Sequence, residues 1–240
     1  MQYQMQAIAN IQTPFSQKFA IPRQGNGLSI AKGKIKFLPH IDVMQALDGI
    51  DAFSHLWILF VFHDNLAQGY KSKVRPPRLG GNKKMGVFAT RSTFRPNAIG
   101  MSLVKNLGFE DKELHVSGVD LLNNTPILDI KPYLPYADIE NTAQAGYAEE
   151  KPTTSLKVNF ADSVYDTLDR LSTQHADYLP LLVSVLEQDP RPAYKQQQAD
   201  NKVYHLALYN SDVHWQVLAN QNNSNSQAPS ILVTNIKIIK

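Results

Sequence analysis

The sequence predicts a β-rich protein of the α+β class, with a strand-dominated first part and a mixed second part. Many short apolar stretches alternate with turn residues early in the chain, which is typical of a β-barrel or sandwich. Helical periodicity appears only after an acidic, alanine-rich segment over 137–154 that contains Pro152. Because 240 residues with 43% hydrophobic content can form two cores, we expect a domain over 1–140, a linker over 141–154 and a smaller domain over 155–240.

Strands in the first part are expected at 3–12, 34–38, 53–62, 101–107, 114–119 and 127–131. The stretch 53–62 is rich in aromatic and β-branched residues, so it predicts a buried strand that ends at His63-Asp64. The stretches 101–107 and 114–119 flank Glu110-Asp111-Lys112 and predict a hairpin. A helical turn is expected at 43–47, ahead of Gly49.

In the second part, the pattern predicts two helices among four strands. The strands are expected at 156–160, 203–209, 213–218 and 231–239, and the helices at 162–172 and 178–186. Three apolar side chains mark one face of the first helix: Val164, Leu168 and Leu171. Pro180 falls in the first turn of the second helix, where proline is tolerated. The segment Asp189–Tyr194 is expected to be a rigid loop.

The segment Gly86–Gly100 combines core-forming and ligand-binding residue types. It begins with the apolar run Val87–Ala89, for which we expect a short strand, and it carries Arg91 and Arg95 among hydroxyl and amide side chains. Arginine offers a planar fork of donors that suits a carboxylate or a phosphate. The mixture predicts a binding loop whose backbone is anchored in the core while its polar groups face a pocket.

Basic residues dominate the surroundings of that segment. No acidic residue occurs between Asp64 and Glu110, whereas the same interval holds Lys71, Lys73, Arg75, Arg78, Lys83, Lys84, Arg91, Arg95 and Lys105. Pro76-Pro77 and Gly80-Gly81 indicate a shaped loop and not a low-complexity tail. A polyanion is the natural partner of such a block, and a merely solvated basic loop is the alternative.

Several classes of chemistry are excluded by missing motifs. The chain has no cysteine, which removes disulfides and thiolate chemistry and fits a reducing, cytoplasmic location. Neither glycine-rich nucleotide-binding motif is present, nor a Gly-x-Ser-x-Gly elbow for a serine nucleophile. The N-terminus has no signal-peptide pattern, and the longest apolar run, 56–62, is too short to span a membrane.

The histidines do not predict a metal site. His55 and His63 would share a face of one strand, but at roughly 3.3 Å per residue they stand about 26 Å apart. Zinc ligands must lie about 2 Å from one ion, so this pair cannot share it. The other histidines show no ligand spacing: His40, His115, His175, His205 and His214.

Four motifs resemble one known family. Gly86–Gly100, Val74-Arg-Pro-Pro-Arg-Leu-Gly-Gly81, Asp129-Ile-Lys-Pro-Tyr133 and Asp189-Pro-Arg-Pro-Ala-Tyr194 are similar to the TsaA-like (YaeB-like) family. The resemblance is strong over about 5–140 and, in the second part, is carried mainly by the last motif. It implies a tRNA methyltransferase that uses S-adenosylmethionine to methylate N6 of threonylcarbamoyladenosine at position 37. It further implies an N-terminal cofactor-binding β-barrel, a C-terminal domain that helps to hold tRNA, and a homodimer.

The resemblance also implies site residues. Cofactor contacts would come from Pro22, Arg23, Gln24, His63, Asp64, Arg91, Met101, Leu121, Leu122, Asn123 and Asn124. Contacts with tRNA would come from Arg75, Arg78, Arg95, Asn97, Asp189, Arg191, Tyr194 and Lys195. The segments Lys71–Lys84 and Arg191–Lys195 would bind phosphates, and Tyr194 would stack on a base of the anticodon loop. His63 and Asp64 are candidates for the general base that would assist attack by the urea-like N6 nitrogen.

Two departures from the family pattern concern loops. The family often has proline at position 98, where this chain has Ala98, and we expect a slightly looser loop. It often has Asp-Gly in place of Asn123-Asn124; asparagine tolerates the same turn but removes a negative charge. Two other functions remain open from the sequence: a non-catalytic RNA-binding barrel, and a methyltransferase that acts on a small metabolite.

Overall fold

The structure, a computed structural model, describes residues 1–19, 21, 22, 24, 25, 27–150, 156–192, 195, 196, 199–219 and 229–239. The chain forms two compact units. The first comprises Met1–Thr13 and Gln24–Lys151, and the second comprises Pro14–Arg23 and Pro152–Lys240. The segment Pro14–Arg23 thus belongs with the later part of the chain, although it precedes the second strand of the first unit.

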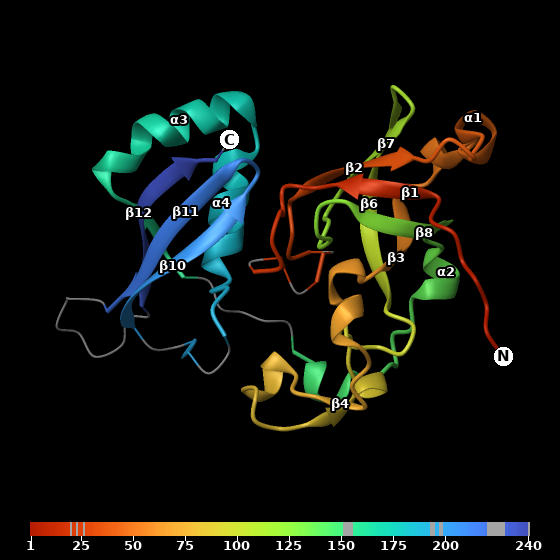
Figure 1. Cartoon of the computed structure of the whole chain (residues 1–240), viewed down its shortest axis with the longest axis horizontal. Coiled ribbons are helices and arrows are strands. Elements are labelled where there is room, and N and C mark those ends of the chain that lie inside the picture. Colours follow the sequence, from red (N-terminus) through yellow and green to blue (C-terminus); the bar gives the residue numbers. More distant parts are fainter. Residues whose placement is uncertain are drawn as a thin grey trace. The chain divides into compact units, whose positions relative to one another are not determined.

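The first unit is a closed barrel of six strands (Figure 1). Its strands are β1 (Ala9–Gln12), β2 (Lys32–Phe37), β3 (His55–Val61), β6 (Ile99–Glu110), β7 (Glu113–Ser117) and β8 (Thr125–Pro132). They close in the order β1-β2-β7-β6-β3-β8, and every neighbouring pair is antiparallel. The β-barrel expected from the sequence and the family resemblance is therefore confirmed.

Alternation along the strands builds the barrel interior. In β3, Leu56, Ile58 and Phe60 are buried while the residues between them are partly exposed. Gly100 on β6 is required by this packing, because a Cβ atom there would come within 2.4 Å of Cζ of Phe60. The barrel is thus filled by side chains, and a ligand site must be built at one of its ends.

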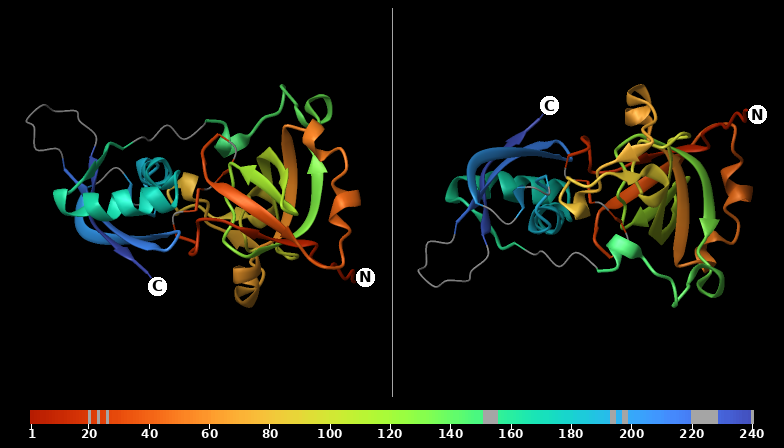
Figure 2. Two further views of the ribbon diagram at one scale, coloured as in Figure 1. Left: turned by 90° about the horizontal axis from the view of Figure 1, so that it is seen from above. Right: turned by 90° about the horizontal axis from the view of Figure 1, so that it is seen from below.

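Short helices, turns and two short strands connect the barrel strands or follow the last of them (Figure 2). They are α1 (Val43–Ala46), η1 (Ile50–Ala52), η2 (His63–Gln68), β4 (Lys73–Val74), η3 (Pro77–Leu79), β5 (Met85–Gly86), η4 (Val87–Ala89), α2 (Pro135–Asp138) and η5 (Gly146–Ala148). Strands β4 and β5 pair with each other and form the base of a loop between β3 and β6 that carries most of the basic residues. The helical turn expected at 43–47 is confirmed by α1, which begins after the capping residue Asp42.

The second unit is a four-stranded sheet with two helices. The strands β9 (Val158–Phe160), β10 (Asp200–Leu208), β11 (Ser211–Leu218) and β12 (Ser230–Ile238) take the order β10-β11-β12-β9, with β9 parallel to β12. A short turn, η6 (Asp162–Val164), leads into α3 (Tyr165–Gln174), and α4 (Tyr178–Glu187) follows. Both helices lie on one face of the sheet (Figure 1) and bury the apolar stripe expected from the sequence, including Val164, Leu168 and Leu171.

Two expected elements differ from the structure. Only the last four residues of the strand expected at 3–12 are in β1, which pairs with β2 and β8 from Ala9 onward. Val87–Ala89 forms a 3₁₀ turn and not a strand, and the side chain of Phe88, expected to anchor the loop, is 73% exposed. None of the helices in the described part of the chain has the length and hydrophobicity needed to span a bilayer.

Candidate functional site: the barrel mouth

Strand register gathers the predicted cofactor residues of the first unit at one end of the barrel. Here Val61 at the end of β3 pairs with Ile99, which begins β6, and Phe60 pairs with Ile127 near the start of β8. Ile11 near the end of β1 pairs with Thr125, which begins β8. We call this end, formed by residues 24, 25, 27–31, 62–64, 98–102 and 118–124, the barrel mouth.

Arg91 reaches the barrel mouth through Gln24. Its Nη1 donates a hydrogen bond to Oε1 of Gln24 at 2.6 Å. The turn that carries Gln24 lies closely on the barrel, because a Cβ atom at Gly25 would stand 2.1 Å from the carbonyl oxygen of Gly118. Only glycine permits that approach, so the turn holds the amide and the guanidinium against the barrel end.

Asp120 is the acidic centre of the barrel mouth. Burial raises the pKa of its carboxyl group, while hydrogen bonds from Ser102 and from the backbone N–H of Gly25, and the charge of Arg91, oppose that rise. The hydroxyl of Ser102 donates to Oδ1 of Asp120 from the inward face of β6. Asp120 was not among the site residues predicted from the sequence; the available signal was a serine at an inward-facing strand position, which needs a polar partner.

The turn at 121–124 has a structural role at the barrel mouth. Oγ1 of Thr13 donates to the carbonyl oxygen of Leu121 at 2.9 Å, and the N–H of Thr13 donates to Oδ1 of Asn123 at 3.0 Å. Leu121 is buried, and Asn124 has a φ of 61°, a left-handed conformation that asparagine adopts readily. The amide of Asn123 thus ties the end of β1 to the turn, and no negative charge is needed for that contact.

The remaining predicted cofactor residues have different environments. His63 and Asp64 begin η2, which is separated from β3 by Phe62 alone; His63 is half-buried and Asp64 is exposed. Met101 points away from the barrel interior and is 53% exposed, so the inward-facing residue at this point is Ser102. Pro22 is buried and groups with the second unit, and Arg23 lies outside the described residues.

Arg95 organises its own loop, a role that the sequence did not predict, and its expected contact with tRNA stays a prediction. Its Nη1 donates to the carbonyl oxygens of Val87 at 3.3 Å and of Thr90 at 2.8 Å. Ala98 closes the loop with a φ of 49° and an N–H that donates to the carbonyl oxygen of Arg95 at 3.2 Å. A proline at that position could not make this bond, so the alanine gives a hydrogen-bonded turn where we expected a looser loop.

The interval without acidic residues, 65–109, carries exposed cationic side chains on the surface of the first unit. Arg75 and Asn97 are exposed, as are most lysines of the interval. We call Lys71, Lys73, Arg75, Lys83 and Lys84 the basic surface. Arg78, by contrast, donates to the carbonyl oxygens of Ala148 at 3.1 Å and Glu150 at 2.8 Å, and so holds the segment after η5 against this loop.

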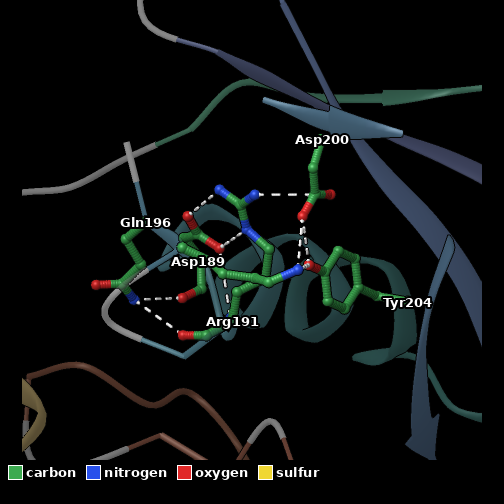
Figure 3. A network of polar contacts seen from close by, with 6 residues as sticks. Asp189, Arg191, Gln196, Asp200 and Tyr204 are labelled. Atoms are coloured by element: carbon green, nitrogen blue, oxygen red, sulfur yellow. Dashed lines mark hydrogen bonds and ion pairs between the residues drawn. The ribbon is translucent and has the colours of Figure 1, made fainter. Parts of the chain in front are cut away.

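Arg191 lies in the core of the second unit and not on its surface (Figure 3). Its side chain is 0% exposed; Nε and Nη2 donate to the two carboxylate oxygens of Asp189, each at 2.7 Å. Lys195 donates to Asp200 at 3.1 Å and to the hydroxyl of Tyr204 at 3.2 Å. The expectation that Asp189 and Arg191 touch tRNA is therefore wrong for this conformation, because both groups are enclosed. Tyr194 lies outside the described residues.

These features define a class of protein: a β-barrel with a cluster of polar side chains at one end, built without the doubly wound sheet of common nucleotide-binding folds. The chain matches the family models of the tRNA-methyltransferase O N-terminal domain over residues 10–139 and of the TrmO C-terminal domain over residues 153–226. It therefore belongs to the TrmO family.

Individual relatives support this assignment over nearly the whole chain. The tRNA (adenine(37)-N6)-methyltransferase of Escherichia coli is 43% identical over 224 residues, which are 90% of this chain and 93% of that protein. The human protein of the same name is 37% identical over 176 residues, 71% of this chain and 40% of that protein. The crystal structure of TrmO from Pseudomonas aeruginosa superposes with a TM-score of 0.79 at 35% identity and covers 99% of this chain and 98% of that one.

Proposed function

We propose that this protein is an S-adenosylmethionine-dependent tRNA methyltransferase that methylates N6 of adenine 37, with threonylcarbamoyladenosine as the modified base. The observation that carries the proposal is the polar group of the barrel mouth, Arg91-Gln24 beside Asp120-Ser102, in a chain similar along its length to a tRNA (adenine(37)-N6)-methyltransferase. A relative named as a putative S-adenosylmethionine-dependent methyltransferase, from Pseudomonas aeruginosa, is 43% identical over 220 residues and supports the choice of cofactor.

The donor set of the barrel mouth fits S-adenosylmethionine. The cofactor bears a carboxylate, an ammonium group and a sulfonium, so it needs one cationic fork and one anionic partner. Arg91 supplies the fork, and Asp120 supplies a partly desolvated carboxylate whose attraction for a cation is greater than in water. Gln24 can donate or accept through its amide. When bound, the cofactor supplies an electrophilic methyl group on its sulfonium.

The chain's own residues would act mainly by positioning. The hydrogen bonds from Ser102 and Gly25 orient the Asp120 carboxylate. The close packing of Gly25 against Gly118 keeps Gln24, and with it Arg91, in place. His63 and Asp64, at the same end of the barrel, are the proposed bases that would accept the N6 proton during attack. Asp120 is already engaged by two donors and is less suited to that role.

The basic surface would hold the polyanionic substrate. Its exposed lysines and Arg75 belong to the same unit as the barrel mouth and lie in a stretch without acidic residues. Such contacts position a nucleic acid without reading its sequence, and they make affinity depend on salt. We further propose that the protein works in the cytoplasm as a homodimer, as the family resemblance implies.

Two measurements test the proposal against its rivals. Calorimetric titration with S-adenosylmethionine should give saturable binding, and purified protein should methylate tRNA that carries threonylcarbamoyladenosine while leaving tRNA with unmodified adenosine at position 37 unchanged. A non-catalytic RNA-binding barrel would bind tRNA without cofactor binding. An enzyme of small metabolites would bind the cofactor but methylate neither tRNA.

A further inference from the structure

The outer face of the β10-β11 hairpin brings together two imidazoles and one carboxylate. His205 on β10 pairs directly with His214 on β11. Asp212 lies on the same face as His214, two residues before it, because side chains alternate along a strand. The helices α3 and α4 cover the opposite face, which carries the buried residues Tyr204, Leu206, Val213 and Trp215, so the three side chains point away from the core.

The three groups converge on one point. Nδ1 of His205 lies 3.3 Å from Oδ2 of Asp212, and Nε2 of His214 lies 3.0 Å from the same oxygen. One ligand atom from each residue lies within 4.8 Å of the others. Tetrahedral zinc with bond lengths of about 2.0–2.2 Å separates its ligand atoms by roughly 3.3 Å, so two of the three spacings already suit an ion.

We propose that His205, Asp212 and His214 form a binding site for a divalent transition metal of the zinc type. Two imidazoles and a carboxylate suit zinc, nickel or cobalt, whereas magnesium prefers oxygen ligands alone. The site is reachable from solvent, since the side chain of His205 is 57% exposed and that of His214 is 14% exposed. Three protein ligands leave the remaining coordination positions to water.

The contacts of Asp212 within the cluster support this assignment. Lys237 is the register partner of Asp212 on β12, but the ion pairs that Asp212 makes within the described residues are to the two imidazoles. All three ligands come from one hairpin, so the site needs no other part of the chain.

The test uses the untagged full-length chain, stripped with a chelator and titrated with zinc in a calorimeter. We expect one zinc per chain, visible absorption on adding cobalt, and no heat with magnesium. His205→Ala and His214→Ala should each weaken zinc binding at least about tenfold, in line with the loss of a metal ligand. His40→Ala, which removes an exposed histidine from the first unit, is the matched control and should bind as the wild type does.

Circular dichroism of the metal-free variants establishes that they fold. Zinc should raise the melting temperature of the wild type and of His40→Ala but not of the two ligand variants, because a ligand that binds only the folded state stabilises it. A wild-type chain that binds no zinc would overturn the proposal. So would unchanged zinc affinity in both His205→Ala and His214→Ala.

Discussion

Arg91 and Arg191 share a residue type and were both assigned to ligands, yet they occupy opposite environments. Arg91 lies on the surface of the first unit and, within the part of the chain that the structure describes, makes one hydrogen bond, to the amide oxygen of Gln24. Arg191 is enclosed in the second unit and forms two short hydrogen bonds with a carboxylate that is itself buried. An arginine whose donors are only partly used can take a ligand, whereas one enclosed by its own acid supports the fold.

The largest effect should follow removal of Arg191. Arg191→Ala leaves the buried carboxylate of Asp189 without its main partner and should lower the free energy of unfolding by about 3–5 kcal/mol. Urea unfolding measures the change, and Arg170→Ala, at an exposed position of α3, is the control. The double variant Asp189→Ala/Arg191→Met should lower the free energy of unfolding by less than the sum of the decreases in Asp189→Ala and Arg191→Met. If the free energy of unfolding of Arg191→Ala lay within about 1 kcal/mol of the wild-type value, Arg191 would not differ from Arg91 in its role in stability.

The corresponding substitution in the barrel mouth should act on binding instead. Arg91→Ala should weaken S-adenosylmethionine binding by about ten- to a hundredfold, because a charge-assisted hydrogen bond contributes about 1.5–3 kcal/mol. Its effect on unfolding should stay within about 0.5 kcal/mol, as for other exposed positions. Calorimetry gives the affinity, and Arg91→Lys, which keeps the charge but not the fork, should recover only part of it. A large loss of stability with intact binding would assign Arg91 to the same role as Arg191.

A smaller effect should follow pH at Asp120. Because burial raises the folded-state pKa of Asp120, its favourable contribution is present below the unfolded-state pKa and is lost as pH rises through the folded-state value. The wild type should therefore lose stability relative to Asp120→Asn over that pH range. Ser102→Ala removes a hydrogen bond that opposes the rise in the pKa of Asp120. The loss of stability should therefore extend to higher pH in this variant. Unfolding measured from acid to neutral pH gives both curves, and parallel curves for wild type and Asp120→Asn would contradict the assignment.

The smallest effect is expected on the basic surface. Arg75→Ala should weaken tRNA binding modestly and reduce the slope of log affinity against log salt by about one unit. Filter binding across a salt series measures the slope. Lys112→Ala is the control, since it removes an equal charge from the turn between β6 and β7, at the opposite end of the barrel strands. Equal slopes for Arg75→Ala and wild type would remove Arg75 from the interface.

Local pattern predicted most elements because they are set by short-range chemistry. The aromatic and β-branched residues of 53–62 and the Asn123-Asn124 turn predicted β3 and the start of β8 at nearly their observed positions. The run Val87–Ala89 was wrongly assigned because three apolar residues carry no measurable period, and hydrogen bonds from Arg95 and Thr90 bend it into a turn.

The contacts of several site residues depend on the register between strands, which the sequence alone does not show. His205 and His214 have no metal-ligand spacing along the chain and become neighbours only through hairpin pairing. Asp120 and Ser102 are eighteen residues apart and meet because β6 pairs with β7, the strand that Asp120 follows. The burial of Arg191 depends on strands that come after it, although the nearby Asp189 was a local sign of an internal ion pair.

The segment Pro14–Arg23 has a consequence for how the protein can be divided. Phe15 is fully buried, and the carbonyl oxygen of Pro14 accepts a hydrogen bond from the N–H of Tyr209. A fragment that begins at Pro152 would lack ten residues of its own unit, and one that ends at Lys151 would carry them without their packing partners. The second unit is therefore not a module that a single cut or a single gene fusion can remove or add.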